Sequence, residues 1–406
     1  METAINPREI KGHDIARRYT IKELNGIWFV PSTSGKGKYK VSLQKQRCSC
    51  PDYELRRERC KHIFAAQIAF EKDFLETILR EENPQPTHPI AIFKKHTQNW
   101  EAYNKSQTTE KAEFQRLLAA LCRMIGDLTQ PTGRPRTALG DIIFACVFKV
   151  FSTVSARRFT VDLQAAEKKG FISSPIHYNT LLRYFENPIL APHLKTLIEE
   201  SSLPLASLEK TFAVDASGLS TTTGFTWLHA KFTEPRLIDK RDWLKIHICA
   251  GTITNIITAV EVTERYEHDH NYFKPLIDAT AQNFEMDEIS ADKGYLSKAN
   301  LESAASLGAV PYIAWKTNTR INPKEGNELW NRLFHWYGLN KEKFLEHYHQ
   351  RSNVETCFAM IKSKFGGGLR SKNRTAQINE ALCKVLAHNL CVLIQSMNEL
   401  GIKTEF

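Results

Sequence analysis

Hydrophobic and polar positions follow different periods in different parts of the chain. From residue 206 onward, short apolar runs alternate with amphipathic segments. These runs predict strands at 211–215, 286–292 and 309–315, two strands within 243–264 joined by a turn around Thr252–Asn255, and helices at 270–284, 293–308 and around residue 355. The order β, β, β, α, β, α, β, α predicts an α/β fold, a mixed sheet with helices on its faces. We therefore expect one domain at 206–395 and a short tail at 396–406.

Residues 113–205 have a helical pattern, beginning with "FQRLLAALCRMIGDL". The proline-rich segment "NPQPTHP" and the polar residues after it predict a linker at 83–112. Two interpretations of the helical region remain open: a DNA reader of the helix-turn-helix type, or a scaffold that orients its neighbours. The segment "TGRPR" also resembles a minor-groove arm. The basic residues near the junctions of this region are Arg134, Arg136, Arg157, Arg158 and Arg183.

The first 82 residues contain a second pattern, with a strand at 38–43 and a helix from residue 62. Cys48 and Cys50 are two residues apart, so on an extended segment their thiols point the same way. Cys60 and His62 stand at the start of the helix. Three thiolates and one imidazole suit a structural Zn²⁺ with no open position. We expect a small ββα zinc finger, whose basic turn binds either DNA or protein through Arg56, Arg57, Arg59 and Lys61.

The remaining composition changes this picture only modestly. Lys and Arg outnumber Asp and Glu by 55 to 45, and the net charge of +10 favours a phosphate-bearing partner. No apolar run approaches the roughly 20 residues that cross a bilayer, and the N-terminus lacks a secretory pattern. We expect a soluble, intracellular protein with no membrane partner. Its other six cysteines sit singly in apolar surroundings and are expected to pack in the core: Cys122, Cys146, Cys249, Cys357, Cys383 and Cys391.

Two aspartates, Asp215 and Asp292, stand where predicted strands end, and small or flexible residues follow both. Carboxylates at strand ends gather at one edge of such a sheet. Together with Glu355 they would offer the oxygen ligands that Mg²⁺ prefers. Two ions about 4 Å apart would then support in-line displacement at a phosphate. Taken one at a time, each aspartate could instead be a turn cap.

The segment "EHYHQRSNVETCFAMIKSKF" predicts a helix with two stripes. Val354, Phe358 and Ile361 form an apolar stripe suited to a core. A neighbouring stripe contains Tyr348, Arg351, Glu355 and Lys362. Taken alone, this second stripe could be a solvated face with an Arg351–Glu355 ion pair.

Three blocks of the sequence resemble the catalytic blocks of DDE-type insertion-sequence transposases: "AVDASG", "ADKGY" and "YHQRSNVETCFAMIK". The last block has the Y-x2-R-x3-E-x6-K signature at all four positions. The Cys-x-Cys and Cys-x-His pairs resemble a SWIM zinc finger. The resemblance implies an RNase H-like catalytic core, in which Asp215, Asp292 and Glu355 bind two Mg²⁺ or Mn²⁺ ions. It also implies that Tyr348, Arg351 and Lys362 contact DNA near the element's ends.

Further residues are expected near DNA. A glycine-rich loop after the catalytic helix suggests flexible backbone that tracks phosphates. Cations in this loop and beside Asp292 are the candidates: Lys293, Lys364, Arg370, Lys372 and Arg374. A His-Asp block at residues 268–270 also resembles the family, and Asp269 is either close to the site or a helix cap. Trp315 and Trp330 are core or interface residues, or stack on a displaced base.

The sequence thus predicts a transposase that nicks its element's ends and transfers the 3′ hydroxyl to target DNA. Its expected partners are double-stranded DNA, at the transposon ends and the target, and a second copy of the chain bound on that DNA. Only 62 residues separate Asp292 from Glu355, which leaves little room for a large insertion that supports hairpin processing. Two alternatives remain: a domesticated, inactive DNA-binding protein and a structure-specific nuclease without joining activity. The resemblance points to a prokaryotic cytoplasm and association with the nucleoid.

Overall fold

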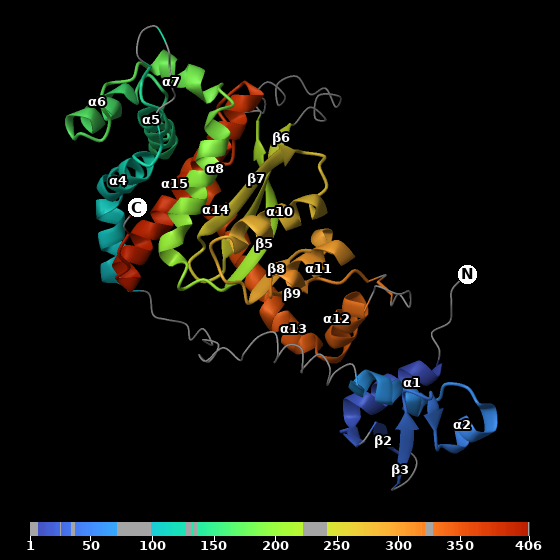
Figure 1. The fold of residues 1–406 in the computed structure, drawn as a ribbon. Coiled ribbons are helices and arrows are strands. Elements are labelled where there is room, and N and C mark those ends of the chain that lie inside the picture. Colours follow the sequence, from blue (N-terminus) through green and yellow to red (C-terminus); the bar gives the residue numbers. More distant parts are fainter. Residues whose placement is uncertain are drawn as a thin grey trace, which may run out of the picture. The chain divides into compact units, whose positions relative to one another are not determined.

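The computed structural model describes residues 7–24, 26–33, 37–70, 99–126, 132, 136–221, 242–317, 319–320, 328–404 and 406. The chain divides into two compact units (Figure 1). One contains residues 1–94 with 318–345, and the other contains residues 95–317 with 346–406.

The first unit contains a four-stranded antiparallel sheet in the order β1-β2-β3-β4. Its strands are β1 (Lys22–Leu24), β2 (Ile27–Pro31), β3 (Lys38–Ser42) and β4 (Arg47–Cys48), and its helices include α1 (Pro7–Arg18), α2 (Pro51–Arg56) and α12 (Glu328–Leu339). Residues 61–70 are also helical. The sheet is larger than the two strands that the sequence suggested, because β1 and β2 form a hairpin ahead of the cysteine-bearing strands. Ile15, Trp28, Val30, Val41 and Ile63 pack in its core.

The second unit is built on a five-stranded mixed sheet in the order β7-β6-β5-β8-β9. Its strands are β5 (Thr211–Ser220), β6 (Trp243–Gly251), β7 (Ile257–Glu264), β8 (Glu288–Ala291) and β9 (Val310–Ile313). β5, β6 and β7 are antiparallel neighbours, whereas β8 and β9 run parallel to β5. This arrangement confirms the expected RNase H-like mixed sheet with helices on its faces.

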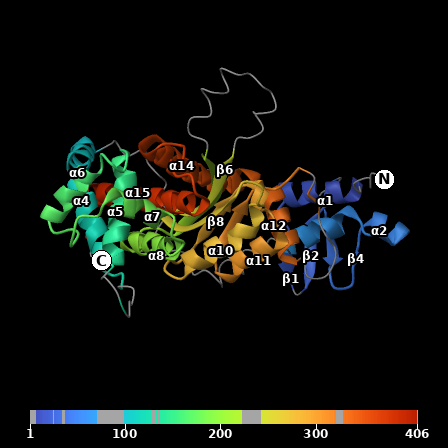
Figure 2. The ribbon, with the colours of Figure 1, turned by 90° about the horizontal axis from the view of Figure 1, so that it is seen from above.

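Helices cover the two faces of this sheet (Figure 2). Alternate residues of β6 point in opposite directions. Ile246, Ile248 and Ala250 join the core formed with α14 (Ser352–Phe365) and α15 (Arg374–Leu400). The intervening His247 stacks on Tyr272 of α10 (His270–Ala281). α11 (Lys298–Ser306) packs against α10 and β9.

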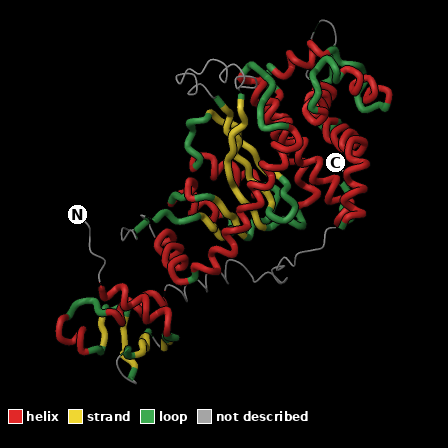
Figure 3. The backbone as a smooth tube through the Cα atoms, turned by 180° about the vertical axis from the view of Figure 1, so that it is seen from behind, coloured by secondary structure: helices red, strands yellow, loops and turns green. Residues whose placement is uncertain are grey.

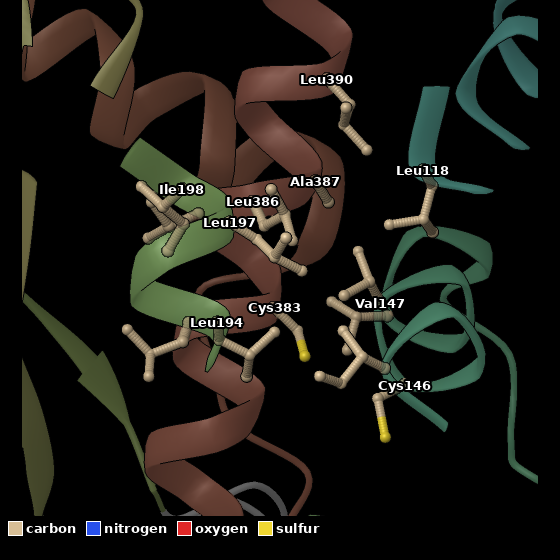
Figure 4. Packing of buried hydrophobic residues seen from close by; sticks show 14 of the residues in the cluster. Leu118, Cys146, Val147, Leu194, Leu197, Ile198, Cys383, Leu386, Ala387 and Leu390 are labelled. Carbon is tan, nitrogen blue, oxygen red and sulfur yellow. The ribbon is translucent and has the colours of Figure 1, made fainter. Parts of the chain in front are cut away.

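In the described part of the second unit, these α-helices precede the sheet: α4 (Trp100–Cys122), α5 (Leu139–Ser152), α6 (Thr160–Lys168), α7 (Tyr178–Phe185) and α8 (Leu190–Ser202). This all-helical block and the adjoining strands can be followed in Figure 3. The long helix α15 joins the two parts, because it packs against α4, α5, α7 and α8 and also against β7. The helical region therefore shares one apolar core with the sheet. Figure 4 shows Leu194 and Leu197 of α8 and Val147 of α5 in this core, with Leu386 of α15.

Three local expectations were wrong. The first helix of the helical region, expected after a linker that ends at residue 112, begins at Trp100, because the polar residues before residue 113 continue the same helix on its solvent side. The strand expected to end at Asp215 continues to Ser220, because β6 pairs with it along that whole length. The single helix expected around Glu355 is divided into α13 (Lys341–Tyr348), a 3-10 turn (His349–Arg351) and α14.

No described helix has the length and apolar character that crossing a bilayer demands.

Candidate metal centres

Four buried side chains in the first unit form a compact cluster. The ligand atoms of Cys48, Cys50, Cys60 and His62 all lie within 4.8 Å of one another. The position of Cys48 is set by the pairing of β4 with β3, in which Cys48 lies opposite Val41. Cys50 caps α2, and its sulfur accepts a hydrogen bond from the Tyr53 N–H at 3.4 Å. The geometry predicted from the Cys-x-Cys and Cys-x-His spacings is thus present.

The chemistry of this cluster fits zinc. His62 is 3 % exposed, and its Nε2 atom has no hydrogen-bond partner although it is buried. A buried ring nitrogen without a partner is costly unless something binds it. Hydrogen bonding from Cys48 lowers the pKa of Cys60 to about 3, with smaller contributions from His62 and the Ile63 N–H. The thiolate, which is the form that binds a metal, is therefore favoured at Cys60. Hydrogen bonding to Cys60 raises the pKa of Cys48, and burial raises the pKa of Cys50.

The second candidate centre lies where β8 ends beside β5. Ala291, the last residue of β8, pairs with Val214, so Asp292 follows immediately after the pairing stops. Asp215 is next to Val214 and lies in the middle of β5. The two aspartates therefore meet because of strand register. Only the second of them stands at the end of its own strand.

The 3-10 turn ahead of α14 brings the third carboxylate to this place. His347, the residue before Tyr348, is 2.8 Å from Glu288 on β8 through its Nδ1 atom, and its ring stacks on Tyr312 of β9. Gln350 accepts a hydrogen bond from Thr252 at the end of the β6 region. Val354, Phe358 and Ile361 are buried as the apolar stripe predicted. Glu288 is the first residue of β8, and Thr252 is hydrogen-bonded to Thr211 at the start of β5, so these contacts fix the segment ahead of α14 near the starts of β5 and β8.

Arg351 lies between two of the carboxylates. Its guanidinium donates to Asp215 Oδ2 at 3.0 Å and to Glu355 Oε1 at 2.5 Å. Burial raises the pKa of Asp215. Arg351 opposes this rise, whereas the charges of Asp292 and Glu355 add to it. The three predicted carboxylates therefore lie within electrostatic reach of one another, with one cation among them.

This site is looser than the cysteine cluster. Among the described residues, the cysteine cluster is the only group of three or more acidic, His or Cys side chains whose ligand atoms all lie within 4.8 Å. The side chain of Asp215 is 20 % exposed and that of Glu355 is 57 % exposed. Hard carboxylate oxygens with an open, solvent-facing side fit a divalent ion that also takes water and substrate oxygens.

The other two members of the charged stripe are near the site. The ring of Tyr348 faces the Arg351 guanidinium, whose carbon is 5.9 Å from the ring centre. Burial raises the pKa of Tyr348, and the charges of Asp292 and Asp215 add to this effect. Lys362 donates to Ser217 Oγ at 2.7 Å, two residues beyond Asp215 on β5. The four residues of the charged stripe therefore lie close to one another, although a 3-10 turn separates the helix of Tyr348 from that of Glu355 and Lys362.

Most cations of the glycine-rich loop have partners within the protein. Lys364 forms an ion pair with Glu110, Arg374 with Glu264 and Asp242, and Arg370 donates to the Thr153 carbonyl. Lys372 is exposed. The expectation of a flexible loop was wrong, because backbone hydrogen bonds tie the loop to β5 and two side chains of α15 bind its backbone.

The remaining candidates have varied positions. Lys293 and Arg136 are exposed, and Arg134 lies outside the described residues. Trp315 is half-buried, as is Trp330, whose indole N–H donates to the Arg320 carbonyl at 3.4 Å.

The His-Asp block lies beside the sheet. Asp269 makes no side-chain cap at α10, which excludes the capping alternative, and instead pairs with Lys245 at 2.8 Å.

Three residues that contact Lys362 or Asp269 were not predicted from the sequence. Ser217 holds Lys362, and Lys245 and the buried His247 lie beside Asp269. Ser217 has no sequence signal of its own. The signal for the other two is a basic residue in an apolar strand, "WLKIHICAG".

Comparison with known families agrees with this geometry. Residues 206–390 match the model of the transposase DDE domain, and residues 39–69 match that of the SWIM zinc finger. The DDE domain implies a divalent metal, and the SWIM match with its three cysteines and one histidine implies zinc. Both matches support a transposase that acts on DNA. The chain therefore carries a SWIM zinc finger at residues 39–69 and a transposase DDE domain at residues 206–390.

Proposed function

We propose that the protein binds the ends of an insertion sequence, cuts a strand at each end and joins the exposed 3′ hydroxyl to target DNA. Asp215, Asp292 and Glu355 are its proposed metal ligands. The supporting observation is the arrangement around Arg351, which binds two of these carboxylates, while burial and then the charge of the third raise the pKa of Asp215. Carboxylates that repel one another in a half-buried place are typical of a site that receives cations.

Each group has a separate proposed task. Divalent ions such as Mg²⁺ or Mn²⁺, two per site, supply activation of the attacking oxygen and stabilisation of the leaving oxygen. Arg351 donates to both Asp215 and Glu355 and presents a planar guanidinium that suits phosphate oxygens. Lys362, fixed by Ser217, and the Tyr348 hydroxyl would bind the DNA backbone beside the cut.

The wider assembly follows from the same chemistry. The net charge of +10 suits a partner that bears phosphates. Two ends must be cut together, so we expect two copies of the chain on paired DNA, associated with the nucleoid of a prokaryotic cell. The exposed cations Lys293, Lys372 and Arg136 are further proposed contacts with DNA, as is Arg134.

A cleavage assay tests this function. The substrate is a plasmid carrying the coding sequence with its flanking DNA, incubated with Mg²⁺. Glu355→Gln should reduce strand cleavage at least about 100-fold, because it removes one anionic ligand while keeping the volume. Glu346→Gln, an exposed glutamate on α13, is the matched control and should cleave like wild type.

Wild-type cleavage by the Glu355→Gln variant would refute the proposed ligands. A second assay with pre-cut ends and a target plasmid distinguishes a transposase from a nuclease, because only the former joins the strands.

A further inference from the structure

The glycine loop, residues 366–371, is held from two sides. On one side it extends the sheet: the Ser220 N–H donates to the Gly367 carbonyl at 3.1 Å, and the Leu369 N–H donates to the Ser220 carbonyl at 2.7 Å. Ser220 is the last residue of β5, and it forms a parallel bridge with Gly368. The loop therefore pairs with the last residue of β5, the strand that carries Asp215.

On the other side, two buried charged residues of α15 bind the loop backbone. Lys384 donates to the carbonyls of Gly366 and Gly368, both at 2.7 Å. Glu380 accepts from the Arg370 N–H at 3.0 Å and from the Ser371 N–H at 2.8 Å. Lys384 is 1 % exposed and Glu380 is 3 % exposed.

Buried charges are expensive unless they perform a specific task. Here the pair supplies donors and acceptors that match the unpaired carbonyls and N–H groups of an irregular backbone. Gly366, at the end of α14, has a φ of +82°, a conformation that favours glycine and turns its carbonyl away from the helix path. Such a segment could not keep one shape through apolar packing alone.

The loop immediately follows α14, which carries Lys362. Lys362 in turn donates to Ser217, three residues before the Ser220 that pairs with the loop. Fixing the loop on β5 thus fixes the end of α14 relative to the strand that bears Asp215.

We propose that Lys384 and Glu380 are positioning residues: they lock the glycine loop onto the end of β5 and so keep Lys362 in register with the carboxylate site. The inference rests on the proposed function for its catalytic consequence. Its structural consequence stands independently, because locking can be measured without any DNA.

Hydrogen exchange of the full-length, zinc-bound protein tests the lock. In Lys384→Met and in Glu380→Gln, amides of residues 366–371 should exchange roughly tenfold faster or more. Glu380→Gln weakens the hydrogen bonds that the Arg370 and Ser371 amides donate, whereas Lys384→Met removes those that two loop carbonyls accept and so loosens the whole loop. Amides of β7 should keep their wild-type rates, which a general loss of stability would not allow. Lys274→Met, which removes an exposed lysine of α10, is the control and should change neither region.

The plasmid cleavage assay then tests the catalytic consequence. At saturating DNA, the same two variants should cleave about tenfold more slowly, while Lys274→Met cleaves like wild type. Should Lys384→Met lack a cooperative unfolding transition, Glu380→Gln decides on both readouts.

Wild-type exchange in the loop of a folded variant would overturn the lock. Faster exchange with undiminished cleavage would overturn the positioning role. If wild-type protein itself fails to cleave, the proposed function fails, and the exchange result alone decides whether the lock exists.

Discussion

The two candidate metal centres are built in opposite ways. The zinc cluster is buried and complete, and its four ligand atoms lie within 4.8 Å of one another. The carboxylate site is half-open, and Arg351 lies among its carboxylates. The first arrangement suits a metal that stabilises a fold, because no position is left for a substrate. The second suits ions that must share their coordination with DNA.

The difference also concerns what stabilises each region without metal. Around the zinc cluster, the small core has few apolar residues besides the ligands themselves. The carboxylate site stands on a sheet whose core extends through α4, α5, α8, α14 and α15. Metal is therefore expected to be necessary for the fold of the first region and only for the activity of the second.

The largest expected effect comes from breaking the zinc cluster. Cys60→Ser should abolish stoichiometric zinc binding and unfold the first unit, because one of four ligands is lost and the remaining core is small. Zinc content by atomic emission and limited proteolysis of residues 7–70 measure this. Cys391→Ser, a half-buried cysteine of α15, is the control and should retain zinc. Full zinc content in Cys60→Ser would contradict the ligand set.

A smaller effect is expected at the carboxylate site. Arg351→Met removes the cation that neutralises Asp215 and Glu355, and should lower the free energy of unfolding by about 2 kcal/mol, because a partly buried ion pair loses one partner. Adding Mg²⁺ should recover more stability in this variant than in wild type, because the carboxylates are then left without a counterion. Thermal unfolding with and without Mg²⁺ measures both changes. Equal responses of the two proteins to Mg²⁺ would argue against a cation site there.

The smallest effect concerns the loop cations. Lys372→Ala should weaken DNA binding and reduce the slope of log affinity against log salt by about 1, because an exposed lysine is available to a phosphate. Lys364→Ala should change this slope less, because Lys364 is already paired with Glu110. Binding titrations at several salt concentrations compare the two. The reverse order would show that the ion pair opens when DNA binds.

Much of the fold could be predicted because its signals are local. The order of strands and helices from residue 206 onward follows from the change of hydrophobic period, and the zinc ligands follow from two short spacings. The apolar stripe of Val354, Phe358 and Ile361 is buried as its helical spacing requires. These features depend on residues close together in the chain, so they can be predicted without knowledge of the tertiary structure.

Other features could not be predicted because they depend on distant partners. The length of β5 beyond Asp215 follows from pairing with β6. The side chains of Lys364, Arg370 and Arg374 are bound by two carboxylates and a carbonyl that lie more than 100 residues away in the sequence. Loop composition alone suggested mobile backbone and available cations, whereas Lys384 and Glu380 hold that backbone in place.

The sequence by itself determined the candidates for the chemistry: four candidate zinc ligands at short spacings, and three carboxylates accompanied by Tyr348, Arg351 and Lys362. Only the tertiary structure decided how those carboxylates meet. The register of β8 against β5 puts Asp292 next to Asp215, and the contacts of His347 and Gln350 place Glu355 beside them. The physical reason is range. Spacing along a strand or helix fixes direction over a few residues, but the approach of segments more than 60 residues apart is set by the core packed between them.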